Sequence, residues 1–254
     1  MWLEARLARL VEEFWEALPY GPEPFPRDLT GAASLALPVV IRELPRLALR
    51  DAHEWLQARG IADHIEGRDR RLRGCLLAYS GHGFVLIDGS DPDDEKRFTR
   101  AHELAHFMLD YQEPRRRVIE ALGEEIIPVL DSMRLPTRIE RLHAILASVP
   151  IGLHVNLMER TPLGGYTSRA TLASEEQADR VALELLAPAA DVWATISALS
   201  DVEGGSHSAQ LKRSEEILRE QYGIPIEQAQ EYGRWLLKKA GRRPGVRDWL
   251  GTGM

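Results

Sequence analysis

The feature that most constrains this chain is the run His102-Glu-Leu-Ala-His106, which has the pattern H-E-x-x-H. On a helix, residues four apart lie one above the other on the same face, so both imidazoles can bind one metal ion. Glu103 then lies beside the metal and can take a proton from an attacking water molecule. The run therefore predicts a metal site with hydrolytic chemistry, provided that it lies on a helix.

A helix is expected around this run, from about Ser90 to Tyr111. Pro92 and the three acidic residues after it, Asp93 to Glu95, would lie in the first turn, which favours both residue types. His102 borders an apolar stripe and His106 lies just beyond it, so the pair is expected at the edge of the core. Two ordinary histidines at a core boundary, without a metal, are the alternative. The stripe consists of Phe98, Ala101, Leu104, Ala105, Met108 and Leu109.

A catalytic zinc site needs a third protein ligand and one open position. Cys75 is the only cysteine, so the candidate for the third ligand is a carboxylate, Glu175. Glu175 and Asp179 lie on the apolar stripe of a predicted helix, where carboxylates are costly unless they are paired or bind metal. Glu175 as a ligand and Asp179 as the acceptor for a ligand imidazole N–H would satisfy both. Alternatively, Glu175 only complements the dipole at the helix N-terminus.

Two segments resemble the ImmA/IrrE family of zinc-dependent peptidases. Residues 97–111 look like the metal-binding helix of that family. Residues 175–188 have the pattern E-x-x-A-D-x-x-A-x-x-L-L-x-P, which is similar to its second motif, although Asn is commoner than Asp at position 179. E-x-x-x-D after H-E-x-x-H is also the broader gluzincin pattern. The resemblance covers roughly residues 39–190.

This resemblance implies an α+β, minimal zincin-like fold in which His102, His106 and Glu175 bind one zinc ion. Glu103 would be the general base, and manganese is the alternative metal. Members of the family cleave helix-turn-helix repressors of stress or mobile-element genes. We therefore expect an endopeptidase whose partner is a protein substrate of that class.

The chain departs from the compact family pattern between its two motifs. Residues 107–174, 68 in number, separate His106 from Glu175. We expect residues 112–173 to hold an insertion, and its apolar content predicts helices that pack beside the cleft and restrict which substrates enter, as a lid would. A stabilising annex on the far side of the domain is the alternative. The predicted organisation is a metallopeptidase domain over 1–188 and a mainly helical region over 189–254.

Other elements follow from periodicity and turn residues. A helix is predicted over 3–18, a second over 39–59, a β-hairpin over 72–88 and a strand over 152–158. Ser174 and Gln177 match a capping box, which predicts that a helix begins there and ends at Pro188. Residues 115–133 and 137–148 are predicted to be helical, as are the last 65 residues apart from a break at Gly204-Gly205.

Weaker site candidates are two histidines and a tyrosine. His143 and His154 could each contact substrate or stabilise an oxyanion, although a lone histidine is more often a surface or satisfied residue. Tyr166 could donate a hydrogen bond to an oxyanion from its loop. Residues 215–240 resemble a helix-turn-helix in outline, but a helical packing unit with a solvated basic face is favoured over DNA binding.

Composition narrows the class of protein. The formal net charge of −7 does not favour a sequence-independent nucleic-acid binder. A single cysteine argues against a disulfide framework and suits a reducing compartment. No apolar run approaches the ~18 residues of a membrane span, and the N-terminus has charges where a signal peptide needs an apolar stretch. We expect a cytoplasmic protein with no membrane partner.

Two other functions remain open at this point. One is a regulatory or DNA-binding protein whose metal site is structural or inert, and the other is a metallohydrolase that acts on something other than a peptide. Structural zinc sites usually have four protein ligands, whereas catalytic sites have three. The number of ligands therefore discriminates between a structural and a catalytic site.

Overall fold

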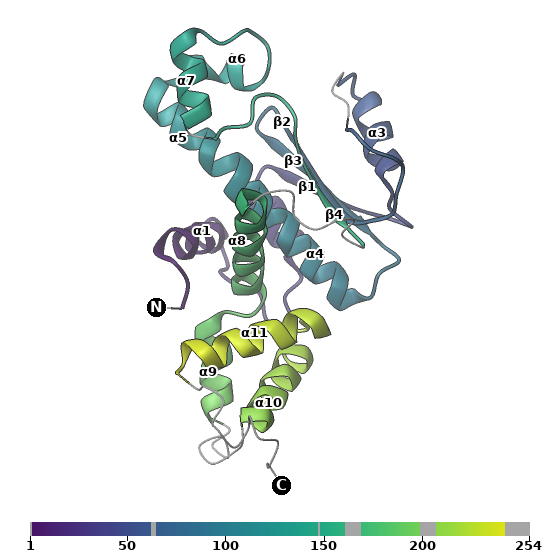
Figure 1. Cartoon of the computed structure of the whole chain (residues 1–254), viewed down its shortest axis with the longest axis vertical. Coiled ribbons are helices and arrows are strands. Elements are labelled where there is room, and N and C mark those ends of the chain that lie inside the picture. Colours follow the sequence, from purple (N-terminus) through teal and green to yellow (C-terminus); the bar gives the residue numbers. More distant parts are fainter. Residues whose placement is uncertain (1, 62–64, 147, 161–168, 199–206, 242–254) are drawn as a thin grey trace.

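The structure is a computed structural model that describes residues 2–61, 65–146, 148–160, 169–198 and 207–241. Its centre is a mixed four-stranded sheet with helices on both faces, and a helical group follows at the C-terminal end (Figure 1). The expected α+β class is therefore confirmed, and the architecture is consistent with a small zincin-like domain.

The sheet has the strand order β1-β3-β2-β4. Its strands are β1 (Val39–Leu44), β2 (Leu72–Tyr79), β3 (His82–Asp88) and β4 (His154–Glu159). β2 is antiparallel to both β3 and β4, while β1 is parallel to β3. The predicted hairpin and the predicted strand near residue 155 are both confirmed.

The predicted helix over 39–59 is wrong in its first part. Val39 to Leu44 form edge strand β1, which pairs with Gly83 to Asp88, and only Leu49–Gln57 form a helix, α3. β-branched residues at the start of the segment pack well on a pleated surface, and Pro45 cannot donate a ladder hydrogen bond, so the strand ends before it. A short apolar run does not distinguish a strand from a helix, and pairing with β3 decided the outcome.

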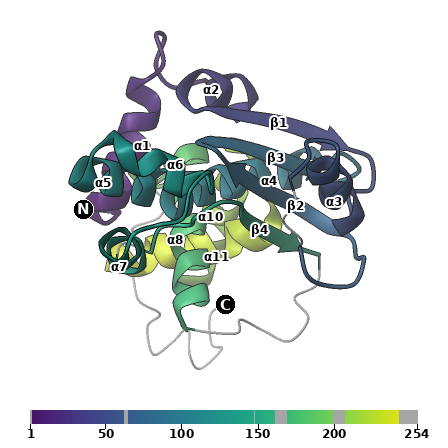
Figure 2. The same cartoon turned by 90° about the horizontal axis from the view of Figure 1, so that it is seen from above.

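The two faces of the sheet are buried by different helices. Successive side chains of a strand point to opposite faces. In β2, Leu76 and Ala78 belong to the main core with α4 (Asp93–His106), while Cys75 and Leu77 belong to a smaller core with α3. Figure 2 shows the sheet between these helices.

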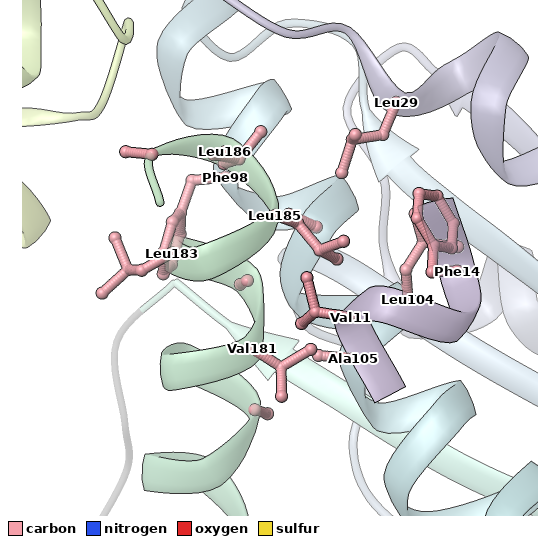
Figure 3. Packing of buried hydrophobic residues seen from close by; sticks show 14 of the residues in the cluster. Val11, Phe14, Leu29, Phe98, Leu104, Ala105, Val181, Leu183, Leu185 and Leu186 are labelled. Atoms are coloured by element: carbon pink, nitrogen blue, oxygen red, sulfur yellow. The ribbon is translucent and has the colours of Figure 1, made fainter. Parts of the chain in front are cut away.

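Helix α4 is enclosed along its second part, from Phe98 to His106. It lies between the sheet and α8 (Arg169–Leu186), and α1 (Ala5–Glu16) and α2 (Leu29–Ala36) cover the rest of this core. Figure 3 shows Leu104 and Ala105 of α4 near Val11 of α1 and Val181 of α8. Every residue from Phe98 to His106 is buried, so the expected single apolar stripe underestimates the burial of this helix.

The predicted capping box at Ser174 is wrong. Among the described residues α8 extends back to Arg169, so Ser174 lies inside the helix, in its second turn. Its hydroxyl donates instead to Asp110, at 2.9 Å. A serine can use its oxygen for a tertiary hydrogen bond as well as for a cap, and the local pattern does not separate the two uses.

The segment between the two motifs is partly sheet and partly helix. A π-helix (Phe107–Gln112) and α5 (Glu113–Leu122) continue directly from α4. A 3₁₀ turn (Glu124–Ile126), α6 (Ile127–Leu130) and α7 (Arg138–Leu146) follow. β4 then completes the sheet, so residues 112–173 are not an insertion throughout. The helical group α5–α7 lies at the end of the molecule opposite α10 in Figure 1.

The C-terminal helices share the main core. They are α9 (Ala189–Ala198), α10 (His207–Glu220) and α11 (Ile226–Lys239), and Tyr232 of α11 donates to the carbonyl of Ala187 at 3.0 Å. Gly204 and Gly205 lie outside the described residues, and the division of the chain at residue 188 stays a prediction. Within the described ranges, no single helix is long and apolar enough to cross a membrane; α8 and α9 pass that test only together, with a 58° bend between them.

Candidate metal centre

The two histidines of the H-E-x-x-H run face one another at the C-terminal end of α4. Their Nε2 atoms are 3.1 Å apart, and both side chains are at most 4% exposed. The pair arises from local geometry, because residues four apart on a helix lie one turn above each other.

A carboxylate holds the other nitrogen of each ring. His102 Nδ1 lies 2.9 Å from Asp179 Oδ1, and His106 Nδ1 lies 2.6 Å from Asp110 Oδ2. An ionised carboxylate can only accept hydrogen bonds, so each Nδ1 carries the proton and donates it. In the neutral rings the Nε2 atoms are therefore free to bind a metal, as in the carboxylate–histidine–metal arrangements of known sites.

Glu175 completes a group of three ligands. Its carboxylate oxygens lie 3.3 Å from His102 Nε2 and 3.5 Å from His106 Nε2, and the three side chains offer ligand atoms within 4.8 Å of one another. Ligands about 2.0–2.1 Å from a zinc ion in tetrahedral geometry are about 3.3 Å apart. The donor set, two imidazole nitrogens and a carboxylate, therefore fits a zinc ion in both chemistry and spacing.

The electrostatics of the group attract positive charge. Burial lowers the pKa of His102, but hydrogen bonds to Asp179 and Glu175 outweigh burial and raise it to about 10. Burial raises the pKa of Glu175, but its contacts with the two histidines bring it well below the ordinary value. The nearby carboxylates stabilise a proton on the imidazoles and would stabilise a metal ion there for the same electrostatic reason. Proton binding and metal binding therefore compete.

Glu103 is enclosed beneath the histidine pair. Its side chain is fully buried, and neither carboxylate oxygen has a hydrogen-bond partner among the described residues. Burial raises the pKa of Glu103 to about 7, although both histidines oppose this effect. A buried carboxyl without partners is costly in a merely structural role, and a pKa near neutrality suits a group that exchanges protons.

Gly74 of β2 makes room for this carboxyl. A Cβ atom at position 74 would lie 2.6 Å from Thr99 Cγ2 and 2.8 Å from Glu103 Oε1. Both distances are too short for any side chain larger than hydrogen. The strand can therefore approach α4 closely at the point where Glu103 lies.

A cavity of about 640 Å³ lies beside Asp110, the carboxylate that holds His106. Asp110, His154 and residues at the end of α7 line it. The ring of His154 stacks on Tyr111 with centroids 6.2 Å apart, and its buried Nε2 has no partner among the described residues. Burial lowers the pKa of His154, so a neutral imidazole is present at the cavity wall.

The remaining site candidates have different outcomes. His143 is exposed on α7 and contacts none of the metal-binding side chains within the described ranges, so a direct role in the site is not supported. Tyr166 lies outside the described residues. Within 112–173, His154 and the end of α7 line a cavity that Asp110 also lines, but none of the three candidate ligands lines it. The expected role of this segment as a lid over the cleft stays a prediction.

Sequence reasoning missed Asp110 and its surroundings. Asp110 follows His106 by four residues and so shares its helix face, which was a usable signal. Burial raises its pKa, but the bond from His106 and the hydroxyl of Ser174 lower it below the ordinary value. The π-helix that carries Asp110 had no such signal; π-helical turns often occur at functional sites.

A comparison with known protein families matches residues 62–126 to the IrrE N-terminal-like domain of peptidase family M78. Over this segment, about a quarter of the chain, the sequence is similar to the ImmA/IrrE family. The matched segment contains β2, β3 and all of α4, hence His102, Glu103 and His106. No curated protein and no solved structure matches the chain.

The family match suggests a metallopeptidase. The match ends at Ile126, so Glu175 and Asp179 lie outside it. Their association with the site rests on the sequence motif and on the contacts described above. The group His102, His106 and Glu175 can bind a metal, and the family is typically metal-dependent.

Proposed function

We propose that this chain is a zinc-dependent endopeptidase that cleaves a protein substrate. The observation that carries the proposal is the convergence of His102, His106 and Glu175, with each imidazole held by its own carboxylate. The family match supports the same reaction class.

In the proposed reaction, His102, His106 and Glu175 would hold a zinc ion, which would supply Lewis-acid polarisation of the scissile carbonyl and a lower pKa for the attacking water. Glu103 takes the proton of that water and passes it to the leaving amine. Asp179 and Asp110 keep the imidazoles in the tautomer that leaves Nε2 free. His154, neutral and at the cavity wall, can donate a hydrogen bond to the substrate.

The number of ligands supports an enzyme over a structural metal site. Within the described part of the chain the group has three members. Structural zinc sites usually have four protein ligands, whereas catalytic sites keep one position open. No observation favours a non-peptide substrate over a peptide, and the family match supports a peptide.

The proposed substrate is a helix-turn-helix transcriptional repressor, in stress response or mobile-element regulation. This finer proposal rests on the resemblance of residues 97–111 and 175–188 to the ImmA/IrrE family. A regulatory protease of this kind needs a cleft that admits a protein chain, and the cavity beside Asp110 is suitably placed.

The test is co-expression with the repressors encoded beside this gene, scored for cleavage by gel and mass spectrometry. Glu103→Gln should retain the metal and lose roughly 10²–10⁴-fold in cleavage rate, because the amide cannot accept the proton. His102→Ala should lose the metal as well. Cleavage by Glu103→Gln within a few-fold of the wild-type rate would show that Glu103 is not the base.

A further inference from the structure

Helix α7 presents an apolar face to solvent. Ile139, Leu142 and Leu146, at helical spacing, are 68%, 56% and 75% exposed. Two more apolar residues just before the helix, Met133 and Leu135, are 75% and 87% exposed. Contiguous exposed apolar surface of this kind marks an interaction site far more often than a scattered surface leucine does.

An ordinary surface helix turns its apolar side chains toward the core, whereas α7 turns most of its apolar side chains toward solvent. Its buried side carries Ala144 and the largely covered Glu140, which is bound to Arg134. The helical group α5–α7 has a small core of its own that uses no residue from the outward face of α7. That face therefore does not stabilise the fold, and a polar face would serve stability better. The small core consists of Val118, Ile126, Val129, Leu130 and Val149.

The outward face of α7 continues into the cavity beside the candidate metal centre. Leu146, at the end of this face, lines the 640 Å³ cavity together with Val149 and Pro150. Asp110 and His154 line the same cavity. A polypeptide that lies along α7 would therefore extend toward the histidine pair without a change of surface.

The exposed charged side chains of α7 itself are both arginines, although the chain as a whole carries −7. Arg138 and Arg141 are exposed on α7, and neither has a carboxylate partner among the described residues. At the cavity, Arg6 and Arg117 share the single carboxylate of Glu113. An apolar surface with a basic rim is complementary to apolar residues flanked by Asp and Glu.

We propose that the outward face of α7 is a docking surface for the protein substrate, and that it recognises an amphipathic, acidic segment of that substrate. The proposal rests on the proposed peptidase function and adds to it the chemistry of the substrate. Such a segment lays its apolar side chains at i, i+3 and i+7 against the face. Arg138 and Arg141 then pair with its carboxylates, which directs the rest of the chain into the cavity.

The test uses the full-length Glu103→Gln protein loaded with zinc and three labelled helical peptides. One peptide is amphipathic and acidic, the second has Lys in place of each acid, and the third keeps the acids but has Ser at the apolar positions. Fluorescence anisotropy should show the tightest binding for the first. Adding Ile139→Ser and Leu142→Ser should weaken that binding at least about tenfold, because both anchors are lost.

The matched control is Leu35→Ser, which removes a leucine that is 61% exposed on α2, outside the proposed surface. It should leave binding of the acidic peptide unchanged. The same double substitution in the wild-type background should raise KM for a cleaved peptide of this class and leave kcat unchanged. Circular dichroism should show that the double variant folds, because both side chains are exposed.

Three results would overturn the docking proposal. One is equal binding of the acidic and basic peptides, or binding that the double variant retains. Another is a wild-type dimer that the double variant dissociates, which would assign the face to a second copy of the chain. The third is binding to phosphatidylserine vesicles, but not to the peptides, that depends on Ile139 and Leu142. Binding is measured without cleavage, so its failure and the failure of the peptidase function are distinguishable.

Discussion

His106 Nδ1 lies 2.6 Å from Asp110 Oδ2, whereas His102 Nδ1 lies 2.9 Å from Asp179 Oδ1. The first carboxylate is on the π-helix that follows α4, one turn beyond its histidine, and the second is on α8. Asp110 is also the less exposed, at 30% against 46% for Asp179. The carboxylates that hold the two ligand rings thus lie on different elements and differ in how far they are buried.

This asymmetry predicts unequal effects on metal affinity. Asp110→Asn and Asp179→Asn should each weaken zinc binding by about 10–100-fold, because the ring loses a charged acceptor. The effect of Asp110→Asn should be the larger, since its bond is better shielded from water. Competition with a chromophoric chelator measures both. Glu176→Gln, exposed and next to a ligand on α8, is the control; equal losses in all three variants would exclude a specific role.

Metal uptake should release protons. The pKa of His102 is raised to about 10 in the metal-free protein, so at pH 7 the ring is protonated and a metal ion must displace that proton. Affinity should therefore rise with pH between about 7 and 10. Titration calorimetry in two buffers of different ionisation enthalpy gives the number of protons released. A value near zero at pH 7 would mean that His102 is already neutral there.

The stability of the metal-free protein should fall as pH rises. The pKa of Glu103 is raised from 4.5 to about 7, so its contribution is fully present below pH 4.5 and is lost between there and pH 7. The glutamine of Glu103→Gln does not ionise, so this variant should not lose stability in that way. The free energies of unfolding of the two proteins should therefore change by amounts that differ by at most about 3 kcal/mol. Urea unfolding with a chelator at pH 5 and pH 8 tests it. Parallel pH profiles for the two proteins would contradict the raised pKa.

Gly74→Ala should destabilise the protein by about 1–3 kcal/mol through overpacking. The added Cβ would meet Thr99 and the carboxyl of Glu103 at less than 3 Å, whereas at Gly31 in α2 the nearest atom is 3.8 Å away. Gly31→Ala is therefore the control and should stabilise its helix by about 0.5–1 kcal/mol. Thermal unfolding compares them. If both variants gain stability, the close approach of β2 to α4 is not real.

Contacts between residues that are close together in the sequence could be predicted from the sequence alone. The spacing of His102 and His106 sets their common helix face because the helix repeat is local. The β2–β3 hairpin is local in the same sense, since a short turn joins two β-rich runs. The E-x-x-x-D spacing placed Glu175 and Asp179 on one face of a helix, although it could not say what that face meets.

Other features were decided only by the tertiary structure, because they depend on contacts between segments that are distant in the sequence. Val39–Leu44 became a strand because β3 offered it a parallel partner, and Ser174 bonds to Asp110 rather than capping a helix. The burial of Glu103 depends on the missing side chain of Gly74, on strand β2, which precedes α4 in the sequence. The pattern of α7 shows an apolar face but not its direction, because periodicity defines a face and only packing decides which way it points.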